Sequence, residues 1–597
     1  MIYTKENVID TFVSLFDISP RDSQVDIILI IVNGENPSTI INAGTGIGKS
    51  LIAVCAAHML YGGYIVAPNR PLQWQYETDP FLKKLFDNGT LALLMGRANY
   101  PCRLRGCSMC EYSDSDECKQ GRNCLDDYDD AGVSSDITDC SQVSYEQDCK
   151  GCEYSSRNCY EGPMCYYHQA KQRAAAASIR IINTAIVSYL PIIFTGCDKK
   201  PVIIYDEAHQ LDGFYRMLCS KGLFNKNILS MVYSHVDNNI PHTTDRYGKI
   251  RVSVESYLGY YHPGELKNIR ESSVQTSQYP ADVPIAPPTA KIILDTYIGH
   301  MKTMLVKGVC AESQTEVRQT LTVAQKICEN ISNFVTTAVS KGYISIKYEP
   351  LFVGFMHAKV ADPESAAPKE VLMSATIFQG YNDKVLGIDG AEYHEFDNGF
   401  KPENSPIYIF SNMSAIYSNR NNFLEWAPVA ITRLLKDYKK RSLIHAHSKA
   451  NMRAIISKLP SDIVRRLVEV NSVTEYRNCL ENFKEGDNSI LISASLKEGI
   501  DLKDDLCRLV ILVSLSVPPP TSAEIVGYQN TLGLNAYAYV GATSLCQSMG
   551  RVIRSSEDNA KIFVLDNRLI SKKHEYYRFM PPQWRRALGK ASTVAGY

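Results

Sequence analysis

The sequence predicts an α/β protein with two parallel-sheet domains and two insertions in the first of them. Short aliphatic runs alternate with helical stretches over residues 36–215, and the alternation returns at 366–597. Strands this apolar, separated by helices, are typical of a parallel sheet that is buried on both faces. Two stretches break the rhythm, a cysteine-rich one at 99–165 and a polar, tyrosine-rich one at 216–365.

The first domain is expected to comprise residues 1–98, 166–215 and 366–384, with the insertions at 99–165 and 216–365. Its strands are expected at 38–42, 64–67, 180–183, 202–205 and 370–376, with a helix at 50–60 after the first of them. The second domain is expected at 385–597, with strands at 442–445, 489–492, 509–513 and 561–565. The insertion at 216–365 is expected to be mostly helical.

The bulk composition is that of a soluble globular protein. The chain has 597 residues, of which 45% are hydrophobic and 21% charged, and a net charge of −1. Any nucleic-acid surface must therefore be a local basic stripe. No signal peptide is visible, and the longest aliphatic run, 25–32, is too short to span a bilayer. We expect a cytoplasmic protein that does not bind membranes.

A glycine-rich loop, AGTGIGKS at 43–50, follows the first expected strand and opens a helix. Glycines let backbone N–H groups approach phosphates, and the helix N-terminus adds positive potential. Lys49 is expected to hold the β- and γ-phosphates of ATP, and Ser50 to bind Mg²⁺. The residues expected to contact the nucleotide are Gly44, Thr45, Gly46, Gly48, Lys49 and Ser50.

An acidic motif, DEAH at 206–209, follows the aliphatic strand at 202–205. Asp206 is expected to be an outer Mg²⁺ ligand, and Glu207 to polarise the attacking water. Asp206 lies 157 residues after Lys49, which is long for one mononucleotide-binding unit. The cysteine-rich insertion accounts for the excess. Either motif alone has a chance explanation, but both in this order favour an ATPase.

Three polar residues near the end of the chain, Gln547, Arg551 and Arg554, have spacings of four and three. On a helix they share one face. An arginine pair that reaches the γ-phosphate from a second domain would stabilise the charge of the transition state. The alternative is a solvated basic helix end.

The order of the loop, the DEAH motif, SAT at 374–376 and QSMGRVIR at 547–554 resembles a superfamily 2 helicase. The sequences leading into Cys102 and out of Cys165 resemble those of the XPD/DinG family of iron–sulfur helicases. KEGID at 497–501 resembles motif V of that family, which adds Asp501 to the nucleotide site. Arg21 and Gln24 resemble the motif ahead of the phosphate loop. The resemblance covers nearly the whole chain and is weakest at 216–365.

The resemblance implies two RecA-like motor domains, an iron–sulfur insertion and an arch-like helical insertion. It implies a monomer that translocates 5′→3′ on single-stranded or forked DNA and hydrolyses ATP, in replication, repair or recombination. The catalytic residues would be Asp206, Glu207, Gln547, Arg551 and Arg554, and His209 and Thr376 would link the nucleotide to the DNA. The tyrosine- and asparagine-rich composition suits an AT-rich genome, such as that of a phage.

Ten of the eighteen cysteines lie between Cys102 and Cys165. A 4Fe–4S cluster takes four thiolates. The resemblance implies Cys102 and Cys165 as its first and last ligands, and Cys152 and Cys159 complete the set, with Cys149 in reserve. The CxxC pair of Cys107 and Cys110 has zinc-like spacing, so either a second metal site or surplus thiols is possible on the sequence alone. The other eight cysteines are interpreted as core residues.

Candidate DNA contacts follow the expected strands, because parallel sheets bind ligands beyond the carboxyl ends of their strands. They are Asn69, Arg70, Trp74, Asn183, Thr184, His447 and Ser448. Two rival functions remain open from the sequence. One is a nucleic-acid-stimulated ATPase that removes proteins or resolves RNA–DNA hybrids, and the other is a redox-responsive binding module with vestigial hydrolysis.

Overall fold

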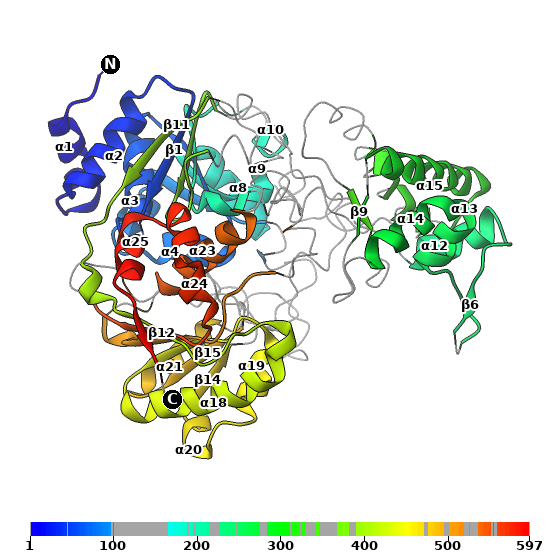
Figure 1. Cartoon of the computed structure of the whole chain (residues 1–597). Coiled ribbons are helices and arrows are strands. Elements are labelled where there is room, and N and C mark those ends of the chain that lie inside the picture. Colours follow the sequence, from blue (N-terminus) through cyan, green and yellow to red (C-terminus); the bar gives the residue numbers. More distant parts are fainter. Residues whose placement is uncertain are drawn as a thin grey trace, which may run out of the picture.

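The computed structural model confirms two α/β domains on parallel sheets, one above the other in Figure 1. The structure describes residues 2–96, 99–100, 165–211, 226–274, 283–310, 367–380, 390–470, 476–494, 502–518, 535–553 and 558–595, apart from 45, 188–189, 195–196, 198, 246, 286, 503 and 551–552, together with short pieces at 213, 313–314, 316–318, 320–322, 324–325, 328, 342–344 and 525.

The first sheet has seven parallel strands in the order β11-β1-β10-β5-β2-β4-β3. Their bounds are β1 Ser38–Ala43, β2 Gly63–Ala67, β3 Leu91–Leu94, β4 Ile179–Asn183, β5 Val202–Tyr205, β10 Lys369–Ser374 and β11 Glu392–Phe396. All residues of β1 are buried, and successive side chains enter different cores: Ile41 packs with the N-terminal helices, and Ile40 packs on the opposite face. The strand β11 pairs with β1, so the first sheet extends past residue 384.

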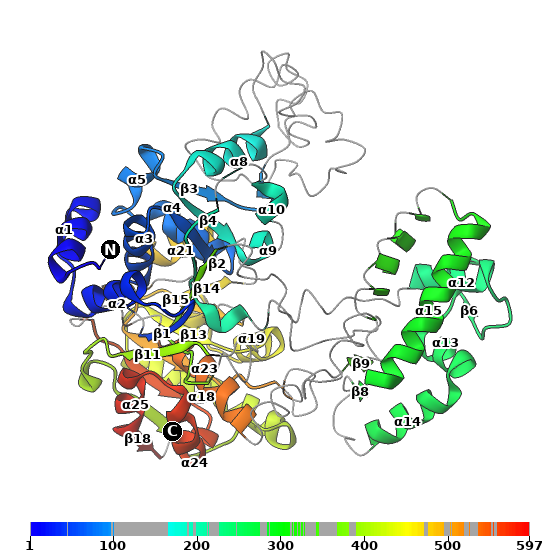
Figure 2. The same cartoon turned by 90° about the horizontal axis from the view of Figure 1, so that it is seen from above.

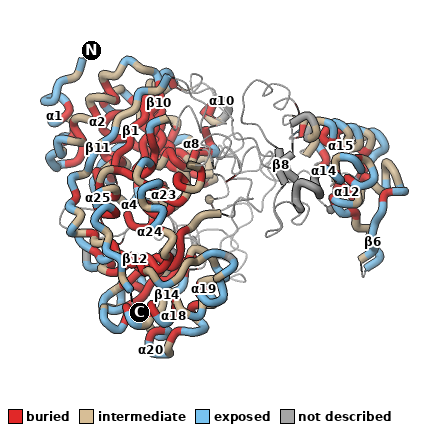
Figure 3. Tube along the Cα trace, viewed as in Figure 1, coloured by how far each residue is buried: buried red, intermediate tan, exposed pale blue. Residues whose placement is uncertain are grey.

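Helices cover both faces of this sheet. Their bounds are α1 Lys5–Phe16, α2 Asp22–Asn33, α3 Lys49–Met59, α4 Arg70–Thr78, α5 Lys83–Asp87, α8 Tyr166–Ala176, α9 Thr184–Val187 and α10 Leu190–Ile193, and the 3₁₀ helix η4 is Ala208–Gln210. Nine of the eleven residues of α3 are buried, because it lies between the sheet and α1 and α2 (Figure 3). This burial fixes the phosphate loop at its N-terminus.

The second sheet also has seven parallel strands, in the order β14-β15-β13-β16-β17-β12-β18. They are β12 Ile407–Phe410, β13 Ser442–His445, β14 Leu467–Val470, β15 Ile490–Ser493, β16 Leu509–Leu512, β17 Lys561–Val564 and β18 Ser592–Val594. Its helices are α18 Arg420–Asp437, α19 Lys449–Ile456, α20 Ser461–Val464, α21 Tyr476–Glu485, α23 Ala536–Met549, α24 Arg568–Tyr576 and α25 Pro582–Gly589.

The two domains share an apolar interface. Phe378, just after β10, places its ring centroid 5.1 Å from that of Tyr539 on α23 and 5.0 Å from that of Phe579. A single cluster of buried residues runs from Ile40 in the first sheet to Leu588 in the second domain. The two sheets therefore face each other across a packed boundary that brings α23 and α25 close to the first domain.

The insertion between β5 and β10 lies to one side of both sheets (Figure 2). It contains α12 Lys226–His235, α13 Val254–Tyr261, α14 Pro263–Val274 and α15 Pro287–Lys307, and two antiparallel pairs, β6 Thr243–Thr244 with β7 Ile250–Arg251 and β8 Val283–Ile285 with β9 Gly342–Ile344. Its buried residues, such as Leu294 and Tyr297, form a core separate from those of the sheets. The expected helical character is therefore observed over the described part.

The eight cysteines outside the cysteine-rich insertion were expected to be buried in the core, and the structure confirms this only in part. Cys55, Cys328, Cys507 and Cys546 are buried, whereas Cys310 is exposed. The interpretation was therefore wrong for Cys310, which follows the end of α15 in the insertion. None of the helices that the structure describes is long and apolar enough to cross a membrane.

Candidate active site

The phosphate loop connects β1, the second strand from one edge of the first sheet, to α3. Gly48 precedes the helix with a φ of +86°, a left-handed conformation that glycine adopts without steric cost. A β-carbon at this position would lie 2.5 Å from Nε2 of Gln24. The loop geometry thus requires glycine here. Gly44, Gly46, Gly48, Lys49 and Ser50 are brought together as the sequence predicts, and Thr45 lies outside the described residues.

Arg21 and Gln24, at the start of α2, brace this loop. Arg21 Nη1 donates a hydrogen bond of 2.8 Å to the Gly46 carbonyl, and Gln24 Nε2 donates one of 3.0 Å to the Ile47 carbonyl. The backbone N–H of Arg21 in turn donates to Oε1 of Gln24 at 2.9 Å. Both residues therefore contact the loop backbone.

Lys49 reaches across the loop to the acidic motif. Its side chain is only 9% exposed, and its Nζ lies 3.6 Å from Oε1 of Glu207. Asp206 and Glu207 directly follow β5, and Glu207 has a φ of +49°. Left-handed backbone is uncommon for a residue other than glycine, and it turns consecutive carboxylates in different directions. The loop lysine and both carboxylates thus meet at the carboxyl ends of β1 and β5.

Asp206 is almost fully buried, with 3% exposure, and this burial changes the pKa of its carboxyl group. Burial, reinforced by the negative charge of Glu207, raises the pKa of Asp206 to about 6. Lys49 and a hydrogen bond from the Tyr76 hydroxyl, 2.9 Å from Oδ2, act in the opposite direction. The Tyr76 phenol also interacts with Ser50. A buried carboxylate and a hydroxyl around one phenol are oxygen donors of the kind that Mg²⁺ prefers, so the residues fit that ion.

His209, the last residue of the acidic motif, contacts residues of both domains. Its Nδ1 lies 2.7 Å from Oγ of Ser374 at the end of β10 and 3.4 Å from Oε2 of Glu207. Its Nε2 contacts the side-chain amide of Gln547, which comes from α23 of the second domain. The backbone N–H of Thr376 donates to Ser374 Oγ at 3.2 Å. One imidazole thus joins the carboxylate, the loop after β10 and the second domain.

Four further motor residues were predicted from the sequence, and one of them, Gln547, lies in the described part of the chain. Arg551, Arg554 and Asp501 lie outside the described residues. Gln547 lies in the last turn of α23, which ends at Met549 with Gly550 as its C-cap. The roles of Arg551 and Arg554 stay predictions.

Comparison with known proteins relates this chain to DNA helicases. The model of the helicase C-terminal domain matches residues 431–587. The ATP-dependent DNA helicase YoaA of Escherichia coli is 21% identical over 94% of this chain and 94% of its own length. DinG of Photobacterium profundum is 31% identical over 102 residues, 16% of this chain and 15% of its own length. A solved XPD helicase superposes with a TM-score of 0.54 at 18% identity and covers 98% of this chain and 99% of its own.

The sequence and fold of the chain are similar to those of the XPD/DinG family of superfamily 2 helicases. The resemblance drawn from the motifs is confirmed. Because the solved XPD helicase shares only 18% identity, it supports the fold, whereas the match to YoaA extends over nearly the full length of both chains.

The two ends of the cysteine-rich insertion meet. The ring centroids of Tyr100 and Tyr167 lie 5.7 Å apart, although the two residues are sixty-seven positions apart along the chain, and Cys165 is the N-cap of α8. Cys102, Cys149, Cys152 and Cys159 lie outside the described residues, as do Cys107 and Cys110. Within the described ranges no group of three metal-binding side chains occurs.

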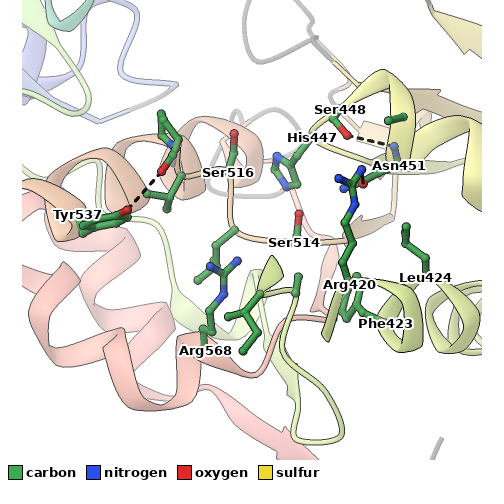
Figure 4. A pocket seen from close by; sticks show the side chains of 16 residues that line it. Arg420, Phe423, Leu424, His447, Ser448, Asn451, Ser514, Ser516, Tyr537 and Arg568 are labelled. Atoms are coloured by element: carbon green, nitrogen blue, oxygen red, sulfur yellow. Dashed lines mark hydrogen bonds between the residues drawn. The ribbon is translucent and has the colours of Figure 1, made fainter. Parts of the chain in front are cut away.

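The second domain carries a cavity of about 630 Å³ beyond the carboxyl ends of β13 and β16 (Figure 4). Arg420 from α18, Asn451 from α19 and Arg568 from α24 line it together with His447 and with Ser448, the N-cap of α19. Arg420 Nη2 donates to Asn451 Oδ1 at 3.1 Å. Arg568 pairs with the fully buried Asp566. The cavity thus presents guanidinium, amide and hydroxyl groups, all suited to a phosphate backbone.

The other candidate DNA contacts have local structural roles. Asn69 Oδ1 accepts from the N–H of Leu72 and caps α4, and Asn183 Oδ1 accepts from the N–H of Ile186. Thr184 is buried. Trp74 is half-buried, with the Arg70 guanidinium 5.0 Å from its ring centroid.

Several site residues were missed from the sequence. Tyr76 lies on an ordinary amphipathic helix, so nothing in its neighbours marks it as a partner of Asp206. Arg420 and Asn451 come from different helices and meet only in the fold. Gln583, which packs on the phosphate loop, lies in a basic segment where the charges draw attention instead.

Proposed function

We propose that this protein is an ATP-dependent DNA helicase that translocates along single-stranded DNA in the 5′→3′ direction, and that the two domains close on the nucleotide between them. The observation that carries the proposal is the position of His209. It contacts Glu207 beside the phosphate loop and Gln547 of the second domain at once, so occupancy of the ATP site and closure of the domains act on one side chain.

The ATP site would work through residues already in place. Lys49, held at the loop, would bind the β- and γ-phosphates, and Glu207 would orient the attacking water. Mg²⁺, held by Ser50 and Asp206, would neutralise charge on the phosphates. Lys49 and Glu207 lie 3.6 Å apart, so binding of a phosphate at Lys49 would release the Glu207 carboxylate toward the water. Gln547, Arg551 and Arg554 would complete the site from the second domain.

DNA would bind along the carboxyl ends of the strands. Ser374 and Thr376 connect His209 to the loop after β10, and the cavity around Arg420 and His447 offers phosphate-binding groups on the second domain. Alternate closing and opening of the domains would move these two DNA-binding regions, the loop after β10 and the cavity of the second domain, relative to each other. The free energy of ATP hydrolysis would thereby advance the protein on the strand.

The cysteine-rich insertion would hold a 4Fe–4S cluster through Cys102, Cys152, Cys159 and Cys165, with Cys149 as an alternative ligand. The adjacency of Tyr100 and Tyr167 supports this, because it brings the chain segments that carry the first and last proposed ligands together. A cluster would stabilise a polar segment that has little apolar core of its own. A monomer is the assembly that the family resemblance implies.

The test is strand displacement on forked DNA with a 5′ or a 3′ single-stranded tail, with ATP and Mg²⁺. We expect unwinding of the 5′-tailed substrate and none with Glu207→Gln. Unwinding of the 3′-tailed substrate alone would contradict the polarity. ATP turnover without unwinding of either substrate, but with removal of a bound protein, would instead support a protein-displacing ATPase.

A further inference from the structure

The side chain of Gln583, the second residue of α25, is buried against the phosphate loop. Gln583 is 4% exposed, and neither Nε2 nor Oε1 of its side chain is bonded to any residue that the structure describes. A β-carbon on Gly44 would lie 2.6 Å from this Nε2 and 2.7 Å from this Oε1. The amide therefore lies directly against the backbone of the phosphate loop and reaches it from the second domain.

Helix α25 holds the amide there through ion pairs with β11, the edge strand of the first sheet, and with the residue that follows this strand. Arg585 pairs with Glu395 at the end of β11, and Arg586 pairs with Asp397. Glu395 also accepts a hydrogen bond of 3.1 Å from Asn42, the residue next to the end of β1. The position of Gln583 is thereby fixed relative to the strand that carries the loop.

A buried amide that lacks a partner is unfavourable, and native proteins normally satisfy such groups with protein, water or ligand. The group that the loop is built to hold is a phosphate chain, whose oxygens accept hydrogen bonds from an amide N–H. Glycine at position 44 permits this close approach of the amide to the loop backbone, because a β-carbon there would clash with the amide. An amide is neutral, so it can adjust to a phosphate without the desolvation penalty of a buried charge.

We propose that Gln583 binds the phosphate chain of the nucleotide through its side-chain N–H, as a further contact from the second domain. The proposal rests on the proposed ATPase function only in its choice of ligand, since the contact concerns binding rather than hydrolysis. It makes α25 a nucleotide-sensing element: a bound phosphate would hold the helix, and the ion pairs of Arg585 and Arg586 would transmit this to β11.

The test is the nucleotide affinity of Gln583→Met, which keeps the length and volume of the side chain and removes the amide. Binding of ADP and of a non-hydrolysable ATP analogue to the full chain is measured by fluorescence titration, with the melting temperature of the nucleotide-free protein as a check of folding. We expect roughly tenfold weaker binding at an unchanged melting temperature, which is the size of effect that one lost hydrogen bond to a charged group produces. Gln314→Met, a hydrogen-bonded glutamine of the insertion, is the matched control and should bind as the wild type does.

A second variant, Gln583→Glu, keeps the shape and adds a negative charge, and should weaken binding further by repulsion. A loss confined to the ATP analogue would place the amide at the terminal phosphate, and a loss shared by ADP at the inner phosphates; both support the proposal. Affinity within twofold of wild type for both variants would overturn it. If the wild-type protein binds nucleotide but does not hydrolyse it, the proposed function fails while this test remains decisive.

Discussion

The hydroxyl of Tyr76 donates a hydrogen bond of 2.9 Å to Oδ2 of Asp206, the carboxylate expected to hold Mg²⁺. Both side chains are buried, and the backbone N–H of Glu207 donates to the other oxygen of the same carboxylate at 3.0 Å. The carboxylate is thereby fixed in one orientation before any ion binds. Such outer partners commonly decide how well a ligand group serves its metal.

Tyr76→Phe should therefore weaken the binding of Mg²⁺ without removing its ligand Asp206. We expect about a tenfold higher Mg²⁺ concentration for half-maximal ATP turnover, the lower end of the range for lost outer-shell partners. The measurement is ATPase rate against Mg²⁺ concentration. Tyr257→Phe is the matched control, because its buried hydroxyl bonds to His300 in the insertion at 2.8 Å. An equal Mg²⁺ requirement in both variants would show that the Tyr76 contact does not orient Asp206.

His209 and Gln547 should act as one unit. Their contact joins the domains, so removing either partner should lower the DNA-stimulated rate, and removing both should cost little more than removing one. We expect a coupling of about 0.5–3 kcal/mol in a double-mutant cycle of His209→Ala and Gln547→Ala, read from kcat. Strictly additive effects would mean that the contact has no part in closure.

Much of the motor was predictable because its signals are local. Runs such as 202–205 and 509–513 give apolar strands in any context, and β5 and β16 lie within one residue of the predicted ends. Glycines before Lys49 and the carboxylates after β5 likewise carry their chemistry in short motifs. The order of these motifs was sufficient to find the resemblance to the XPD/DinG helicases.

The parts that the sequence did not predict depend on distant contacts. The strand β11 lies at the sheet edge and contains only exposed and half-buried residues, so its apolar signal is weak, and its partner β1 lies about 350 residues earlier. Tyr76, Arg420 and Gln583 become site residues only when separate helices pack together. No periodicity marks such residues, because their neighbours form ordinary amphipathic helices.

Arg420 should contribute to DNA affinity through charge. Arg420→Ala removes one cation from the cavity of the second domain, so single-stranded DNA should bind more weakly. The slope of the logarithm of the binding constant against the logarithm of the salt concentration should become shallower by about one. Fluorescence anisotropy at several salt concentrations measures both quantities. Arg508→Ala is the control. Arg508 directly precedes β16, so it lies at the amino end of this strand and away from the cavity, and it pairs with Asp558 at 2.9 Å. A salt dependence equal to wild type would exclude Arg420 from the DNA path.

The helical insertion should unfold independently of the motor. Its core is separate, so Leu294→Ala should destabilise it by about 2–5 kcal/mol, the usual cost of such a cavity. Differential scanning calorimetry should show one transition shifted to lower temperature and another unchanged, with ATP turnover on single-stranded DNA retained below the first transition. A uniform shift of all transitions would show that insertion and motor unfold together.

The most direct test of the account is ATP turnover by the purified protein with and without single-stranded DNA, compared between the wild type and Lys49→Ala. We predict that DNA raises the wild-type rate several-fold and that Lys49→Ala abolishes turnover in both conditions. A wild-type rate that DNA leaves unchanged, in protein shown to bind both ATP and DNA, would contradict the claim that His209 couples the two sites.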